Sequence, residues 1–143
     1  MEWIWEQVQR FPIIFDDFGK GNKKAFFDKL MNPANGFVDI GPGKGIACLF
    51  NIRPRLDANC HIVMFDRKLK GREPLLKQVL AYAFSVLCLR RLTAWISEDA
   101  YLASALAERL GFRLEGTMRQ SMLREGRYVD VRIYGMLREE LSL

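Results

Sequence analysis

Apolar residues follow two periods along this chain, one typical of helices and one typical of strands. Spacings of three and four residues predict helices over about 2–11, 23–31, 74–88 and 100–110. Short apolar or alternating runs predict strands over 37–40, 46–53, 59–65, 92–96, 112–123 and 127–137. The expected order is therefore ααβββαβαββ, an α/β (α+β) arrangement with helices packed on a mixed sheet.

Glycine-containing turns are expected to join neighbouring strands. Residues 41–45 (GPGKG) lie between two apolar runs. Neither Ser nor Thr follows the lysine, and a strand comes next, so this segment predicts a hairpin turn rather than a phosphate-binding loop. Glu125-Gly126 predicts a second hairpin between the last two strands.

The helix expected over 100–110 has recognisable ends and an apolar stripe. Asp99 stands where an N-cap residue is expected, and Gly111 follows the last apolar residue as a C-terminal cap would. The side chains expected to be buried are Leu102, Ala103, Leu106, Ala107 and Leu110.

The composition is typical of a globular chain with a sizeable core. Of its 143 residues, 50% are hydrophobic and 27% are charged, and we expect residues 1–143 to form a single domain. The apolar runs are too short to cross a membrane and the first residues lack a basic leader, so we expect a cytoplasmic protein. Cys48, Cys60 and Cys88 lie in apolar surroundings and predict reduced core thiols. One histidine and no CxxC pair predict no metal site.

The net charge of +5 and the pI of about 9.3 suit a nucleic acid, an acidic protein or a polyanionic small ligand. Lysine and arginine form no run longer than three residues, and no aromatic-basic repeat typical of single-strand binding is present. A nucleic-acid partner therefore rests on charge alone, and we do not favour it.

Basic residues gather at the junction between a strand and a helix in the middle of the chain. The apolar run 62–65 leads into a turn in which cationic side chains surround Gly71, and helical spacing begins at Leu75. A helix start presents unpaired N–H groups and the positive end of the helix dipole, which together favour phosphate or pyrophosphate. The alternative is an ordinary turn with solvated lysines, because one glycine in a basic turn is not specific.

The last third of the chain carries motifs of a known family. They are 107–112 (AERLGF), Glu115-Gly116, Arg119, 126–130 (GRYVD) and 134–140 (YGMLREE). With these motifs and the central junction, residues 36–140 resemble the GCN5-related N-acetyltransferase (GNAT) superfamily, in particular the branch that acetylates ribosomal-protein N-termini. The resemblance implies a mixed, mostly antiparallel sheet of about six to seven strands flanked by helices. It also implies acetyl-CoA as cosubstrate and an amine as acceptor.

The resemblance also implies where the cosubstrate would bind. Pantetheine would lie along the strand before the basic turn, often at a β-bulge, beside Phe65 and Asp66. The residues that would hold the pyrophosphate or surround it are Arg67, Lys70, Gly71, Arg72, Glu73 and Pro74. The loop register stays open, since either Lys68 or Arg67 can take its first family position.

The family's catalytic positions are partly altered in this chain. Many members place a tyrosine on the second core helix to protonate the departing thiolate, and Ala107 stands there. The acid is then Ser104, Tyr101, a water molecule or no group at all. His61 is the first candidate base, since it lies on the strand beside the acyl group and titrates near neutrality. The other candidate bases are Glu115 and Asp130.

The functional hypothesis is an acetyl-CoA-dependent N-acetyltransferase. An amine of a small molecule or of a protein N-terminus would attack the thioester directly in a ternary complex. The alternative is a CoA-binding or interaction domain that kept the fold with little or no catalysis. The acceptor pocket would be formed by the first 35 residues and the final hairpin, and a homodimer is compatible with the sequence.

Overall fold

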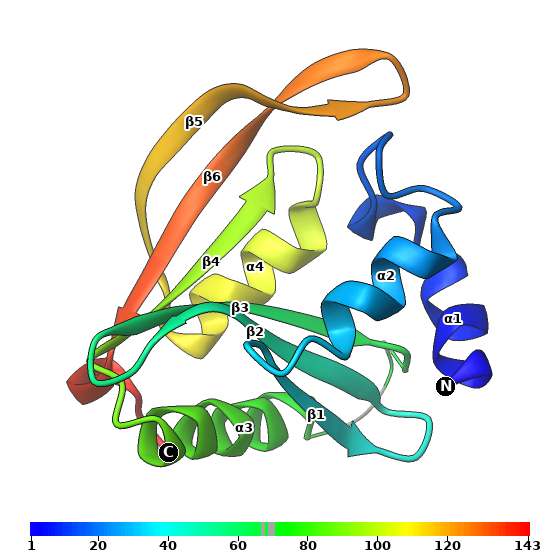
Figure 1. The fold of residues 1–143 in the computed structure, drawn as a ribbon. Coiled ribbons are helices and arrows are strands. Elements are labelled where there is room, and N and C mark those ends of the chain that lie inside the picture. The colour runs from blue at the N-terminus through cyan, green and yellow to red at the C-terminus, as the bar shows by residue number, and fades with distance from the viewer. Residues whose placement is uncertain (67, 69–70) are drawn as a thin grey trace.

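The chain folds into a six-stranded sheet with helices on both faces (Figure 1). The structure is a computed structural model that describes residues 1–66, 68 and 71–143. The helices are α1 (Glu2–Gln9), α2 (Lys23–Leu30), α3 (Arg72–Val86) and α4 (Tyr101–Leu110), with short 3₁₀ helices η1 (Pro12–Ile14) and η2 (Arg138–Glu140). The strands are β1 (Gly36–Gly41), β2 (Gly45–Arg53), β3 (Asp57–Met64), β4 (Arg91–Ser97), β5 (Arg113–Arg124) and β6 (Arg127–Leu137). The order ααβββαβαββ and the mixed sheet are confirmed.

The strands are arranged in the order β1-β2-β3-β4-β6-β5. β3 and β4 are parallel, whereas the other neighbouring pairs are antiparallel. A parallel pair needs a crossover connection, and α3 supplies it between β3 and β4. This connection places the start of α3 at the end of β3, beside the boundary between the two halves of the sheet.

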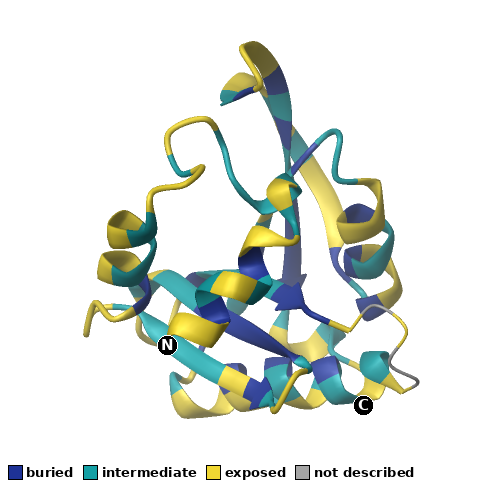
Figure 2. Cartoon of the chain, turned by 90° about the vertical axis from the view of Figure 1, so that its right-hand side faces the viewer, coloured by how far each residue is buried: buried dark blue, intermediate teal, exposed yellow. Residues whose placement is uncertain are grey.

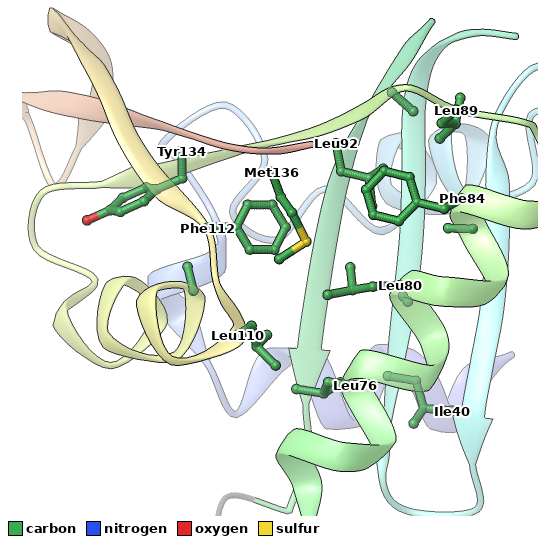
Figure 3. Close-up of a cluster of buried hydrophobic side chains, with 14 of the residues drawn as sticks. Ile40, Leu76, Leu80, Phe84, Leu89, Leu92, Leu110, Phe112, Tyr134 and Met136 are labelled. Carbon is green, nitrogen blue, oxygen red and sulfur yellow. The ribbon is translucent and has the colours of Figure 1, made fainter. Parts of the chain in front are cut away.

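The larger hydrophobic core lies between the sheet and the helices α3 and α4 (Figure 3). Leu76, Leu80 and Phe84 recur along α3 at helical spacing and pack against Leu92 of β4 and Met136 of β6. Figure 2 shows the same division, with buried positions on the central strands and exposed positions on the outer helix surfaces and the β5–β6 hairpin.

A second core covers β1–β3 on the opposite face of the sheet. It is built from Ile4 and Val8 of α1 and Leu30 of α2, which pack on Val63 and Phe65. Because α1 and α2 contain only eight residues each, their stability comes from this packing rather than from helix propensity.

The helix α4 is turned differently from the sequence-based expectation. Ser104, Ala107 and Leu110 are buried, whereas Leu102 is 68% exposed and Ala103 is also exposed. The expected stripe was therefore wrong at its first two positions, because the face that meets the sheet follows the i, i+3, i+6 positions from the serine. Asp99 is not the cap either: the N-cap is Ala100, without a side-chain hydrogen bond.

Both expected hairpins are confirmed. Lys44 donates its backbone N–H to the Gly41 carbonyl over 2.9 Å, and β5 and β6 meet at Glu125-Gly126. Irregularities in β5 interrupt the expected alternation and leave Leu114 exposed.

The cysteines differ from expectation at one position, since Cys88 is exposed while Cys48 is buried and Cys60 partly buried. All three are free thiols. Among the described residues, no helix is long and apolar enough to cross a membrane, and no cluster of three His, Cys, Asp or Glu side chains could hold a metal ion.

Candidate functional site

The parallel strands β3 and β4 separate soon after they start. Asp57, Ala58 and Asn59 pair with Arg91, Leu92 and Thr93, but β3 continues to Met64 and β4 to Ser97 without further pairing between them. Figure 1 shows the two strands diverging from a common start. The far halves of both strands are therefore not paired with each other, and this split in the backbone of the sheet is called the opening.

Backbone polar groups line both sides of this opening. The N–H of Phe65 donates to the Lys44 carbonyl over 2.8 Å and so points towards β2. Because bonding directions alternate along a strand, the N–H and C=O groups of Ile62 and Met64 point the other way, towards the opening. An extended ligand lying in the opening could exchange hydrogen bonds with this edge.

His61 and Trp95 lie on opposite sides of the opening. Each is two residues beyond the last pair, Asn59 with Thr93. Side chains alternate along strands, so His61 shares the face of Val63, which α1 and α2 cover. Leu92 packs in the core on the α3 side, and Trp95 therefore lies on the same face as His61. Both side chains are exposed.

The pKa of His61 lies below its ordinary value, chiefly because surrounding protein disfavours the charged ring, and secondly because Lys29 is positively charged. The ring has an open accessible surface. The two observations agree, because a ring can be reached from one side while nearby protein still weakens hydration of its cation. His61 is thus neutral at pH 7 and able to accept a proton.

A cysteine stands directly beside this histidine. Cys48 of β2 pairs with His61 across the strands and shares its face. Burial raises the pKa of the Cys48 thiol to about 12, so the thiol stays protonated. A nucleophilic cysteine needs thiolate character, and this pair therefore does not favour an acyl-cysteine intermediate.

The two acid candidates of α4 differ in their surroundings. Ser104 is 6% exposed, and its Oγ is a buried side-chain oxygen that has no hydrogen-bond partner among the described residues. Tyr101, at the first residue of the helix, is 74% exposed. An unpaired buried hydroxyl is costly, so the Ser104 Oγ is suited to a ligand atom.

Gly71 begins α3 in the left-handed conformation, with φ of 73°, which only glycine adopts without strain. Leu75 makes the first helical bond, from its N–H to the Gly71 carbonyl over 3.3 Å, and no side chain in the described part of the chain caps this end. Pro74 has no N–H, so it removes one possible anion donor. The Glu73 carboxylate accepts from Arg109 Nε of α4 over 2.6 Å, so it is neutralised by a neighbouring helix.

Of the other residues predicted to bind the cosubstrate, one is buried, one is exposed and two are not described by the structure. The Phe65 ring is buried edge-to-face against Trp3, with 5.5 Å between ring centroids. Asp66 is exposed and accepts a hydrogen bond from the Lys68 N–H over 2.9 Å. Arg67 and Lys70 lie outside the described residues.

The other two candidate bases are engaged in hydrogen bonds. Glu115 accepts from Arg91 of β4 over 2.6 Å. The Asp130 side chain accepts from the Gln120 N–H over 2.8 Å and supports the irregular part of β5. Both carboxylates therefore already have hydrogen-bond donors within the fold.

A buried arginine, not anticipated from the sequence, joins several elements beyond the opening. Arg124 donates to Ser97 Oγ over 2.8 Å and also to the Asp99 carboxylate. Its other nitrogens donate to the carbonyls of Ile13 over 2.6 Å and Phe15 over 3.2 Å. An arginine at the end of an alternating strand gives no sequence signal for such long-range contacts.

Two aspartates near the N-terminus, Asp16 and Asp17, accept hydrogen bonds from backbone N–H groups in turns. Asp17 accepts from the N–H groups of Glu125 over 2.6 Å and Gly126 over 2.9 Å, and these bonds lower its pKa. Asp16 accepts from the Gly19 N–H over 2.7 Å. The segment before α2 is thereby fastened to the hairpin.

Hollows on the described surface include one on the hairpin beside Thr117 and Asp130, and one of about 310 Å³ between α3 and β1–β3 that includes Tyr82 and Val86. Neither of these is lined by His61 or Ser104. The strand geometry, rather than a hollow, therefore makes the opening between β3 and β4 the candidate site.

The sequence matches no protein-family model and no curated protein. Its fold is shared with solved N-acetyltransferases of the GNAT type. A variant of spermidine N-acetyltransferase SpeG from Vibrio cholerae is similar with a TM-score of 0.70 and 18% identity, over 93% of this chain and 88% of that chain. The SpeG complex with CoA and spermine gives a TM-score of 0.66 and 21% identity, over 88% and 78%.

Two further structures share the fold over a smaller part of their own length. Mycobacterium smegmatis RimJ in complex with CoA-disulfide has a TM-score of 0.67 and 18% identity, over 84% of this chain and 61% of that chain. A probable acetyltransferase has a TM-score of 0.58 and 24% identity, over 68% of this chain and 56% of that chain. This chain thus spans less than two thirds of either protein. At these identities the likeness defines a GNAT fold and leaves the branch open.

Proposed function

We propose that this protein is an acetyl-CoA-dependent N-acetyltransferase. The observation that carries the proposal is the separation of β3 from β4, on the strand that leads along the chain to the glycine N-cap of α3. An elongated thioester could bond to the free strand edge while its pyrophosphate meets the helix N-terminus. The CoA bound in the similar SpeG and RimJ structures supports this assignment.

The side chains around the opening suit direct transfer. The neutral amine nitrogen would attack the thioester carbonyl carbon and form the new C–N bond. The C–S bond then breaks, and sulfur leaves with the bonding electrons as a thiolate. His61 would accept the amine proton directly or through a water molecule, while strand N–H groups stabilise the oxyanion. The Ser104 hydroxyl would donate a hydrogen bond to the thiolate, which finally takes a proton from solvent.

The proposed cosubstrate contacts are divided between strand and helix. The edge of β3 towards Met64, with Phe65 and Asp66 after it, would lie along pantetheine, and Gly71 with Arg72 would meet the pyrophosphate. Glu73 would not repel the phosphates strongly, because Arg109 neutralises it. The acceptor would approach from the face of the sheet opposite to α3, where His61 is exposed. The spermine of the SpeG complex makes polyamines one acceptor class to test.

Thermal unfolding with acetyl-CoA and thiol release with a panel of amines test the proposal. A ligand that binds the native state raises the melting temperature by mass action. Stabilisation together with amine-dependent thiol release supports an enzyme, whereas stabilisation without thiol release favours the CoA-binding alternative. Absence of both effects would remove the proposal.

Substitutions of His61, on one face of the sheet, and of Ser104, on the other, test the mechanism. We expect His61→Gln to lower kcat/KM about 100-fold, the size typical of a lost general base, with CoA affinity unchanged. Ser104→Ala should lower kcat by a smaller factor, because solvent can also protonate a thiolate. Tyr101→Phe is the matched control on the same helix, and equal losses in Tyr101→Phe and Ser104→Ala would contradict the assignment to Ser104.

A further inference from the structure

An aromatic ring stands uncovered on the acceptor side of the sheet. Trp95 is 55% exposed, although the side chains of Thr93 and Ser97 on the same face of β4 are buried. β4 is a central strand, paired with β6 along its full length. A large exposed ring in a central strand offers an apolar platform to a ligand.

Apolar side chains of the next strand lie on the same face as this ring. Ile133 of β6 is directly opposite Trp95, and Val131 is opposite Ser97. Ile133 is partly buried and Val131 is buried. Trp95, Ile133 and His61 therefore share one face of the sheet, here called the floor, with the histidine across the opening from the ring.

The carboxylates near this floor already have partners. Glu115 is bonded to Arg91, and Asp99 to Arg124. Glu98 accepts from the Asp130 N–H over 3.1 Å. A cationic ligand would have to compete with the two arginines for Glu115 and Asp99, because a carboxylate held by an arginine has little remaining attraction for a second cation.

A lysine adds positive charge on the same side. Lys29 of α2 lies over the Phe50 ring, with 4.2 Å from Nζ to the ring centroid. Phe50 pairs with Asn59, two residues from His61 on β3. Within the described part of the chain, no carboxylate forms an ion pair with Lys29. Its field reaches His61, as the direction of the histidine's pKa shift also indicates.

We infer that the acceptor is a monoamine with an apolar, aromatic body, which lies on Trp95 and directs its nitrogen to His61. Polyamines are poor acceptors, because their additional positive charges meet paired carboxylates and an unpaired lysine. This assignment of acceptor class rests on the proposed acetyl transfer.

A matched set of amines tests the inference on the full chain. Thiol release from acetyl-CoA is measured with 2-phenylethylamine, propylamine and spermidine. We expect kcat/KM for phenylethylamine to exceed that for propylamine by about tenfold, the factor that one ring contact of about 1.4 kcal/mol supplies. Spermidine should be the weakest acceptor. If spermidine is the best acceptor, the inference is wrong while the acetyltransferase proposal stands; if no amine releases thiol, both are wrong.

Two variants separate ring contact from charge. Trp95→Ala should raise KM for phenylethylamine about tenfold and leave kcat and the KM of propylamine unchanged, whereas Trp95→Phe should retain most of the preference. Tyr82→Ala, which removes an exposed ring of α3 away from this face, is the control. Equal KM changes for both amines in Trp95→Ala would overturn the platform assignment.

Reversal of the lysine charge tests the second half of the inference. Lys29→Glu should raise kcat/KM for spermidine several-fold, by replacing repulsion with attraction. Lys24→Glu makes the same charge change on α2 at an outward position beside Asp28 and should have little effect. Equal gains from both variants would show a non-specific charge effect and contradict the role of Lys29.

Discussion

The two halves of the sheet, β1–β3 and β4–β6, are fastened to the rest of the chain by different forces. On β1–β3, α1 and α2 pack through apolar and aromatic side chains, including Trp5, whose ring centroid lies 5.4 Å from that of Phe26. At the outer end of β4–β6, the contacts are polar and centre on Arg124. The candidate site lies along the boundary between the two halves. The β1–β3 side can therefore be destabilised by removing side-chain volume, and the β4–β6 side by removing hydrogen bonds.

Of the changes proposed for the two halves, loss of the Arg124 side chain should lower the free energy of unfolding the most. Arg124→Ala leaves the partly buried Asp99 carboxylate and two N-terminal carbonyls without their donor. Removal of one partner from a buried ion pair typically costs about 3–5 kcal/mol of unfolding free energy. Urea unfolding measures this loss. Arg127→Ala, an exposed change on the same hairpin, should cost under about 0.5 kcal/mol, and a similar loss in both variants would contradict a special role for Arg124.

Removal of the Trp5 ring, which packs on the β1–β3 half, should cause the second largest loss of unfolding free energy. Trp5 is half-buried and contacts the rings of Phe15, Phe26 and Phe27. Trp5→Ala should therefore cost about 3 kcal/mol, the lower end for a large aromatic truncation. Because the loss is apolar, it should be the same at low and high salt. A salt-dependent loss would show that polar contacts also hold α1 in place.

A pair of glycine substitutions sharpens the contrast. At Gly45 of β2, an added Cβ would lie 2.3 Å from the Val63 carbonyl oxygen, which is backbone of β3. At Gly135 of β6, the nearest atoms belong to the ends of the Glu115 and Arg91 side chains, at 2.3 and 2.5 Å. Gly45→Ala should cost about 2 kcal/mol because backbone must move, whereas Gly135→Ala should cost under about 1 kcal/mol because an exposed ion pair can shift. Thermal unfolding of both variants tests the order, and a larger loss for Gly135→Ala would reverse the comparison.

The pH dependence of stability should show the smallest effect. The pKa of His61 is lower in the folded chain than its ordinary value of 6.5, so the unfolded chain binds the proton more readily. This contribution to stability is fully present above about pH 6.5 and is lost as the pH falls through the unfolded pKa towards the folded one. His61→Gln should remove that step from urea unfolding measured between about pH 5 and 8, and an unchanged profile would contradict the shift. His61 is the chain's only histidine, which makes this window specific.

Much of the fold was predictable because its signals are local. The helices and strands of the second half follow clear periods, and both hairpin turns carry glycine at the expected places. The first turn of α4 was mispredicted, since apolar Leu102 is exposed and polar Ser104 is buried. The sequence of a helix with small residues on several sides does not show which side meets the sheet. The sheet against which the helix packs determines that side.

The candidate site was predictable only in part. His61 and Ser104 were selected from their positions in the resemblance; they lie on opposite sides of the sheet, and their roles as base and acid stay predictions. Trp95 gave no signal, because an aromatic residue in a short apolar run is expected to be buried. Two of the groups that Arg124 bonds, the carbonyls of Ile13 and Phe15, are more than 100 residues away in the N-terminal segment, beyond the reach of any periodic pattern.

By itself, the sequence determined the order of the elements, the turns and most of the apolar core, since these follow from backbone propensity and periodicity within short windows. Only the tertiary structure decided where β3 and β4 part, which side chains stand on either side of that opening, and which charges are already paired. Those features depend on contacts between segments distant in the chain, where the packing of one element fixes the exposure of another.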